Sequence, residues 1–386
     1  MASTERMVKH IDFLDGLRAL AALFVLFSHV WFQLWPAVVP PYEYGHRPTG
    51  LTLIFTSWLF YGHFAVVVFI VLSGFCLMLP VVHSSGVLDG GTLNFFKRRA
   101  KRILPPYYFA LLFSLISIWL FINLKTGTHW DISLPVTFVG FMAHLAMMQD
   151  IVTTTQINYV FWSIALESHL YLYFPLLVLS WQRFGGIRTT LGTGLLIYTT
   201  IILLEINHVK FIPPQFIGMC FYFVLGMLAA TIVFSQEKFW YLVRQHFPCH
   251  FAIASSVLMI IFFCYLWGFD LAFERLAFLD TLCAFAALSL LIAASHPGEN
   301  KLRDFLSSRP LVFIGTFSYS LYLVHAPLLQ IIWQYGLHPL HLGEVLEFIL
   351  LLVIGTPLIL LAAYLFFFYC EQPFLNTHSE RAKNKS

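Results

Sequence analysis

The sequence predicts an all-α protein that crosses a membrane about ten times. Of its 386 residues, 59% are hydrophobic and 11% are charged, whereas about 25% of a soluble domain is charged. Long apolar runs also recur along the whole chain, each near the length of about 20 residues that a bilayer requires. These runs lie near residues 14–36, 62–82, 104–124, 163–181, 190–207, 214–234, 250–268, 276–294, 311–335 and 344–369.

One shorter apolar segment, 133–149, decides the topology. Lys and Arg accumulate on the cytoplasmic side of membrane proteins. With ten spans and the N-terminus inside, 17 Lys and Arg residues fall inside and 4 outside; an eleventh span at 133–149 gives 9 inside and 12 outside. Ten spans are therefore favoured, with both termini cytoplasmic and residues 133–149 forming a re-entrant or interfacial helix.

Other features limit the class of protein further. Residues 1–375 are expected to form a single transmembrane domain, followed by a short polar cytoplasmic tail at 376–386. The run 51–61 extends the second apolar stretch, so part of it is expected along the outer interface.

Six cysteines show no metal-ligand spacing, which predicts no metal site. The net charge of +3 is too small to indicate a nucleic-acid partner, and the lipid bilayer is the expected surrounding.

The first apolar run carries two ionisable residues, Arg18 and His29. Eleven residues of helix place both on one face, about 16 Å apart along the axis. Each ionisable group inside a bilayer costs roughly 2.5–3.5 kcal/mol on insertion scales, so the two require partners or a polar cavity. The functional interpretation is a catalytic or translocation pathway. The alternative is an arginine that reaches the interface and a histidine bonded to a neighbouring helix.

A second group of polar residues falls in later runs. The stretch FWSIALESHLYLYFP places Trp162 and Ser163 at the outer rim, with Glu167 about 7 Å deeper, at a depth similar to that of His29. A carboxylate beside the imidazole would raise its basicity and fix its tautomer; a structural ion pair of Glu167 with another helix is the alternative. Tyr322 and His325, three residues apart, share one helix face.

Six motifs in order resemble acyltransferase family 3, the bacterial integral-membrane O-acyltransferases. The motifs are DGLRALAALFVLFSH, FIVLSGFCL, FFKRRAKRILPPYY, WSIALESHLYLYFP, SYSLYLVHAPL and EQPF, spread over residues 12–374. The chain departs from the family pattern at Val67, Ile70 and His169. A role for a carboxylate at position 67 is therefore not expected here, whereas the Arg18 and His29 pair is present.

The resemblance implies transfer of an acyl group, usually acetyl, from cytoplasmic acyl-CoA to a hydroxyl, with acyl-CoA as a co-substrate and no permanently bound cofactor. Arginine binds phosphate through two parallel hydrogen bonds, so Arg98, Arg99 and Arg102, together with Arg18, are predicted to hold the donor. Anchoring of these basic residues to anionic lipid is the alternative.

The predicted catalytic residues are His29 as general base, Glu167 as the group that orients it, and Arg18. A covalent acyl-histidine intermediate remains an open alternative. Trp162, Ser163, Tyr322 and His325 are predicted to contact the acceptor.

The predicted function is therefore an O-acetyltransferase of a bacterial cytoplasmic (inner) membrane that modifies a surface polysaccharide or a lipid-linked sugar. Acylation of a small secreted glycosylated molecule and a non-enzymatic transporter or exporter are the alternatives. His10 and Asp15 match the His-x4-Asp spacing of glycerolipid acyltransferases, but Asp15 is better explained by the dipole of the first helical turn.

Overall fold

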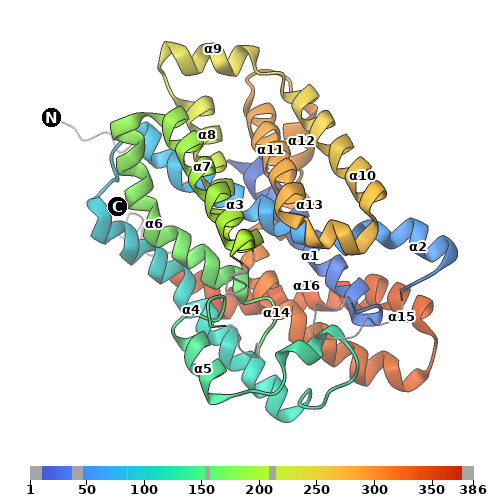
Figure 1. Cartoon of the computed structure of the whole chain (residues 1–386). Coiled ribbons are helices and arrows are strands. Elements are labelled where there is room, and N and C mark those ends of the chain that lie inside the picture. Colours follow the sequence, from blue (N-terminus) through green and yellow to red (C-terminus); the bar gives the residue numbers. More distant parts are fainter. Residues whose placement is uncertain (1–10, 37–46, 85, 153–156, 208–213, 376–386) are drawn as a thin grey trace. The chain divides into compact units, whose positions relative to one another are not determined.

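The computed structural model describes residues 11–36, 47–84, 86–152, 157–207 and 214–375, and within these ranges every regular element is a helix (Figure 1). The α-helices are α1 (Asp12–Leu34), α2 (Gly50–Thr56), α3 (His63–His83), α4 (Gly91–Leu120), α5 (Phe138–Leu145), α6 (Trp162–Phe184), α7 (Gly186–Ile206), α8 (Pro214–Phe234), α9 (Lys238–His246), α10 (Cys249–Glu274), α11 (Leu276–Ser295), α12 (Lys301–Leu306), α13 (Arg309–Thr316), α14 (Ser318–Ile331), α15 (Glu344–Leu350), α16 (Thr356–Phe366) and α17 (Gln372–Leu375). The all-α prediction is confirmed.

Short helices of other types connect or extend these. Among the described residues, three are 3-10 helices, at Ser57–Tyr61, His129–Ser133 and His338–Leu340. Three are π-helical segments, at Ile332–Leu337, Leu351–Gly355 and Phe367–Glu371.

The number of candidate spans agrees with the predicted ten. In the described part of the chain, nine helices are long and apolar enough to cross a membrane, and α13 with α14 makes a tenth if the pair is taken as one span. The one α-helix within residues 133–149 is α5, which is eight residues long. It reaches about 12 Å and cannot cross a hydrocarbon core about 30 Å thick. The cytoplasmic position of both termini stays a prediction.

The apolar run at 51–61 forms α2 and the following 3-10 helix. The side chains of Leu51, Ile54 and Phe55 in this run are exposed. That the run lies along the outer membrane interface stays a prediction. The tail 376–386 and His10 lie outside the described residues.

The chain divides into two compact units that are each assembled from distant segments. Unit 1 comprises Met1–Leu20, Val67–Phe95 and Leu172–Gly315, and unit 2 comprises Ala21–Val66, Phe96–Tyr171 and Thr316–Ser386.

Within unit 1, α11 packs against α8 and α10, and α8 packs against α7 (Figure 1). Helices α3 and α8 approach closely at two glycines. A Cβ at Gly74 would lie 2.0 Å from the Phe223 carbonyl oxygen, and a Cβ at Gly226 would lie 1.9 Å from that of Val71. Small residues permit this kind of contact between helices in membranes.

Within unit 2, α14 packs against α16, and buried polar side chains link its helices. The Gln33 amide of α1 donates to the side-chain oxygen of Gln330 at 2.7 Å. The Trp333 indole donates to Glu347 at 2.8 Å, and the Ser320 hydroxyl donates to Glu371 at 2.5 Å. Buried polar groups without partners are costly in apolar surroundings, so these contacts help to fix the helix that carries His325.

Candidate active site

His29 of α1 is joined to His325 of α14 by a direct hydrogen bond. The distance from His29 Nδ1 to His325 Nε2 is 2.8 Å, and the two rings are stacked with centroids 5.0 Å apart. His325 is 1% exposed, whereas His29 retains a partly accessible surface. The structure thus brings a predicted catalytic residue and a predicted acceptor-binding residue into contact within unit 2.

The contacts of His325 fix the tautomers of both rings. His325 Nδ1 lies 2.9 Å from the Tyr322 carbonyl oxygen and 3.1 Å from that of Leu321. A carbonyl only accepts, so Nδ1 carries the proton, and in the neutral ring Nε2 is then an acceptor. His29 Nδ1 must therefore donate to it, which leaves His29 Nε2 with an unprotonated lone pair. This is the state that a general base requires.

Two side chains that the sequence analysis did not assign complete the cluster. The Tyr159 ring meets the His29 ring edge to face at 5.0 Å and the His129 ring at 4.6 Å. His129 lies 6.1 Å from His29 between ring centroids. Both residues belong to the connection between α4 and α6, and no periodicity in the sequence links them to α1.

The side chain of Asn158 holds Tyr159 in place. Pro327 has no backbone N–H, so the carbonyl of Leu323, four residues earlier in α14, lacks its helical donor. The Asn158 amide donates to that carbonyl at 3.2 Å and to the Ser114 hydroxyl of α4 at 3.1 Å. The proline that the sequence places inside α14 thereby creates the attachment point for the segment next to His29.

Burial sets the protonation of the two added residues. It lowers the pKa of His129 to about 4 and raises the pKa of the Tyr159 hydroxyl. At neutral pH, His129 is therefore an uncharged imidazole and Tyr159 a hydroxyl that can donate a hydrogen bond. No group of three or more His, Cys, Asp or Glu among the described residues is arranged to hold a metal ion.

The predicted acceptor-binding residues also approach one another. The Ser163 hydroxyl of α6 lies 2.6 Å from the Tyr322 hydroxyl, and the Tyr322 ring centroid lies 5.8 Å from that of His325. Trp162 stacks on His63 with centroids 5.9 Å apart. Ser163 and Tyr322 thus place two hydroxyls one helical turn away from the histidine pair.

Glu167 lies on the same helix as Ser163 and accepts a hydrogen bond from the Tyr171 hydroxyl. The side chain hydrogen-bonded to His29 Nδ1 is His325, at the position where the sequence analysis placed a carboxylate. An orienting role for Glu167 stays a prediction.

The predicted donor-binding arginines lie in different units. Arg18 of unit 1 donates to the Asp15 carboxylate at 2.6 Å and to Cys76 Sγ at 3.0 Å. In unit 2, Arg98 and Arg102 are exposed on α4 and Arg99 is half-buried. Their role in binding a donor stays a prediction.

These features define a polytopic helical membrane protein with a hydrogen-bonded histidine pair beside two hydroxyl-bearing side chains. Residues 11–368 match the family described as "Acyltransferase domain", and the chain belongs to that family. The family predicted from the sequence motifs is confirmed, and with it the acyltransferase class.

Two relatives of this chain are named as O-acetyltransferases. The chain is 25% identical over 355 residues to O-acetyltransferase OatA of Staphylococcus aureus (strain NCTC 8325 / PS 47), which covers 85% of this chain and 52% of that protein. It is 24% identical over 341 residues to peptidoglycan O-acetyltransferase OatA of Listeria monocytogenes, which covers 84% of this chain and 50% of the relative. The chain thus spans about half the length of these relatives. No solved structure matches it.

Proposed function

We propose that this protein is an integral-membrane O-acyltransferase that moves an acyl group, acetyl in the first instance, from acyl-CoA to an alcohol. The family assignment supports the reaction class. The observation that carries the mechanism is the hydrogen bond of His29 Nδ1 to His325, because it leaves the opposite nitrogen of His29 free to accept a proton. A transporter or exporter has no evident need for that arrangement.

The proposed reaction begins with the acceptor hydroxyl beside His29. Nε2 removes its proton as the oxygen attacks the thioester carbonyl, so that a C–O bond forms and the carbonyl oxygen becomes an oxyanion. The C–S bond then breaks, and the proton held by His29 passes to the leaving thiolate. General-base assistance of this kind contributes typically about 10²–10⁴-fold.

The surrounding residues take supporting roles in this proposal. His325 positions His29 and fixes its tautomer. The Tyr159 hydroxyl, which burial keeps protonated, is a donor suited to stabilising the oxyanion. The paired hydroxyls of Ser163 and Tyr322 are suited to hydrogen-bonding the acceptor, with Trp162 as an adjacent aromatic surface. Transfer through an acyl-His29 intermediate is the variant of this mechanism.

The donor is proposed to bind from the cytoplasm against the basic segment of α4. Arg98 and Arg102 are exposed at i and i+4, so one phosphate or pyrophosphate can meet both guanidinium groups. Arg99 and Arg18 are the further candidates. This arrangement requires the proposed topology, with both termini inside, within the cytoplasmic membrane of a bacterium.

A sugar hydroxyl on a surface polysaccharide or lipid-linked precursor is the proposed acceptor. The printed name of the Listeria relative assigns peptidoglycan to that protein, which supports a glycan here. A small secreted glycosylated molecule is the second candidate. We further propose that units 1 and 2 are parts of one acyltransferase domain over residues 1–375, because the family match extends through segments of both.

Mass spectrometry of surface glycans tests this proposal. Cells that produce the wild-type protein should carry a base-labile acetyl ester that is absent from cells without it. A His29→Ala variant should abolish the ester, whereas His250→Ala, which removes an exposed histidine of α10, should not. Normal acetylation by a membrane-inserted His29→Ala protein would contradict the proposed mechanism.

A further inference from the structure

Three neighbouring rings of unit 2 carry polar atoms that no protein group satisfies. The ring centroids of His29, His129 and Tyr159 lie 4.6–6.1 Å apart, and Tyr159 is 7% exposed. Within the described part of the chain, the Tyr159 hydroxyl, both ring nitrogens of His129 and Nε2 of His29 form no hydrogen bond. Polar groups inside folded proteins are nearly all hydrogen-bonded, so a set of this kind indicates a position for a substrate.

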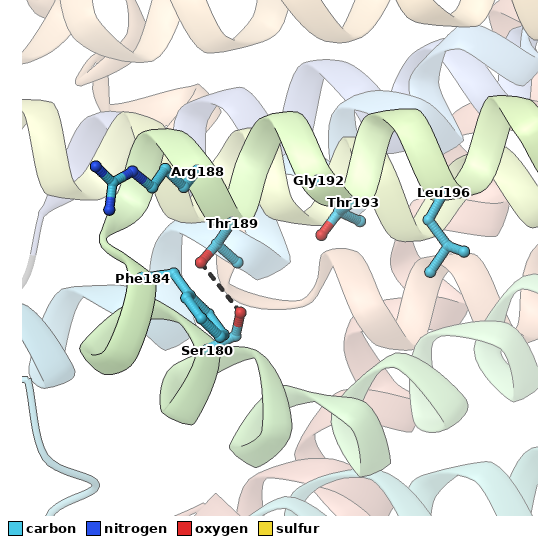
Figure 2. A pocket seen from close by; sticks show the side chains of 7 residues that line it. All are labelled: Ser180, Phe184, Arg188, Thr189, Gly192, Thr193 and Leu196. Atoms are coloured by element: carbon cyan, nitrogen blue, oxygen red, sulfur yellow. Dashed lines mark hydrogen bonds between the residues drawn. The ribbon is translucent and has the colours of Figure 1, made fainter.

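A groove between α6 and α7 in unit 1 offers no comparable set of polar atoms (Figure 2). The Ser180 and Thr189 hydroxyls that line it lie 3.1 Å apart and are hydrogen-bonded to each other. The Arg188 guanidinium is directed away from both hydroxyls (Figure 2). The polar atoms available to a ligand are therefore those around His29.

The position of His129 is fixed by its neighbours, although its ring makes no hydrogen bond. The ring stacks on Phe32 of α1 with centroids 5.4 Å apart. The Asp131 carboxylate, two residues further along, accepts from the backbone N–H groups of Thr126 and Gly127, each at 2.9 Å. These two bonds close the turn that leads into the 3-10 helix at its start, His129.

Gln330 ties the same turn to α14, the helix that carries His325. The Thr128 hydroxyl donates to the side-chain oxygen of Gln330 at 3.0 Å, and the Gln330 amide donates to the Thr126 hydroxyl at 3.0 Å. Gln330 is fully buried. The His129 ring is thus positioned before a substrate arrives, as electrostatic stabilisation of a transition state requires.

The surroundings of His129 also indicate which nitrogen carries its proton. Nδ1 is buried without a partner, whereas Nε2 is accessible. Buried N–H groups without an acceptor are rarer in proteins than under-satisfied acceptors, so the proton is expected on Nε2. Burial lowers the pKa of His129 to about 4, which keeps the ring neutral at pH 7. A neutral imidazole N–H is a donor that can polarise a carbonyl group.

We propose that His129 is a further catalytic residue, whose Nε2–H donates, together with the Tyr159 hydroxyl, to the oxyanion formed during acyl transfer. This role rests on the proposed O-acyltransferase function. As the acceptor oxygen forms the C–O bond, the π electrons of the thioester carbonyl move onto its oxygen, and both donors stabilise that charge while keeping their protons. When the C–S bond breaks, the electron pair returns to the carbonyl, and the thiolate takes the proton that His29 removed from the acceptor.

Two substitutions of His129 separate hydrogen bonding from packing. His129→Phe keeps an aromatic ring against Phe32 and Tyr159 but removes the donor, whereas His129→Gln loses the ring and keeps an N–H donor. The assay is the initial rate at which cells form ester-linked acetate on surface glycans after brief induction, measured by mass spectrometry at equal amounts of membrane-inserted protein.

Loss of one oxyanion donor lowers the rate by about 10²–10³-fold, so we expect a loss of that size in His129→Phe and a smaller one in His129→Gln. Tyr159→Phe should lose a similar amount, and it should fold because the missing hydroxyl has no hydrogen-bond partner among the described residues. His250→Gln, which replaces an exposed histidine of α10, is the control and should keep the wild-type rate.

The outcomes distinguish this role from the proposed function. A wild-type rate in His129→Phe or in Tyr159→Phe, beside loss of the ester in His29→Ala, would overturn the two-donor site and leave the function standing. A faster rate in His129→Phe than in His129→Gln would show that His129 acts by packing and not as a donor. Absence of the ester from cells with the wild-type protein would contradict the proposed function, and with it the role of His129.

Discussion

Replacing His325 by leucine tests whether this residue acts through His29. The substitution removes the acceptor of the His29 Nδ1 proton, at 2.8 Å, and places an apolar side chain in a buried position. A buried N–H without a partner costs about 1–3 kcal/mol. The His29 ring can avoid this cost if it rotates or moves its proton to the other nitrogen. The population of the catalytically competent state then falls by about 5- to 150-fold.

The expected consequence is a fall in kcat of about that size, with a smaller change in KM. His325→Gln should recover part of the rate, because the glutamine side-chain oxygen can accept the hydrogen bond. His325→Leu should also lower the free energy of unfolding by up to about 1–3 kcal/mol, because it leaves the buried His29 N–H without its acceptor, and His325→Gln should lower it less, because it keeps an acceptor. Thermal unfolding in detergent checks that expectation beside the acyl-transfer assay.

A double-substitution cycle provides the refuting result. If His325 acts by positioning His29, then His325→Leu has no further effect once His29 is alanine. Equal losses of rate in the wild-type and the His29→Ala backgrounds would show that His325 works independently of His29. A wild-type rate for His325→Leu alone would contradict the positioning role altogether.

Three further predictions concern the surroundings of the histidine pair. Gly62→Ala should lower both the unfolding temperature and the acyl-transfer rate, because its Cβ would lie 2.2 Å from the Ser28 side chain, next to His29. Gly336→Ala is the control: its Cβ would meet no heavy atom within 4 Å, so both quantities should stay unchanged. Asn158→Leu should destabilise the protein by about 1–3 kcal/mol in thermal or denaturant unfolding, since it leaves a buried carbonyl of α14 without its side-chain donor; an unchanged unfolding midpoint would contradict this. The pKa of His129 is about 4 in the folded protein, whereas the ordinary value is 6.5. Below pH 6.5 the unfolded chain therefore takes up a proton that the folded chain does not. The free energy of unfolding should fall as the pH is lowered from 6.5 to 4, by at most about 1.4 kcal/mol per pH unit. His129→Gln should flatten that dependence in unfolding curves at pH 7, 6 and 5, and an identical slope for the two proteins would refute the assignment.

The helices were predictable because length and apolar composition are local properties of the sequence. The run at 250–268 illustrates this, since α10 departs from helical geometry at Gly268, with φ +65°, where the apolar run ends. Charge in the loops excluded a span at 133–149, and α5 is too short to cross. The motif resemblance supplied the family, which the match over residues 11–368 confirms.

The partner of His29 was not predictable in the same way. His29 and His325 are 296 positions apart, and their contact depends on how α1 and α14 pack rather than on any local pattern. Glu167 was favoured as the partner because it lies at a depth similar to that of His29. Depth does not show which faces of two helices meet, so it could not identify His325. Tyr159 reaches the cluster through Asn158 and the carbonyl that Pro327 leaves open, a relation visible only once the chain is folded.

The protonation state of His29 tests the central claim most directly. Nitrogen NMR of the ¹⁵N-histidine-labelled protein in lipid bilayers, with His29 assigned by comparison with a His29→Gln sample, distinguishes protonated from unprotonated ring nitrogens. We predict a neutral ring at pH 7.5 with the proton on Nδ1 and a bare Nε2, and loss of that pattern in His325→Leu. A proton found on Nε2 of the wild-type ring would leave no base where the mechanism requires one.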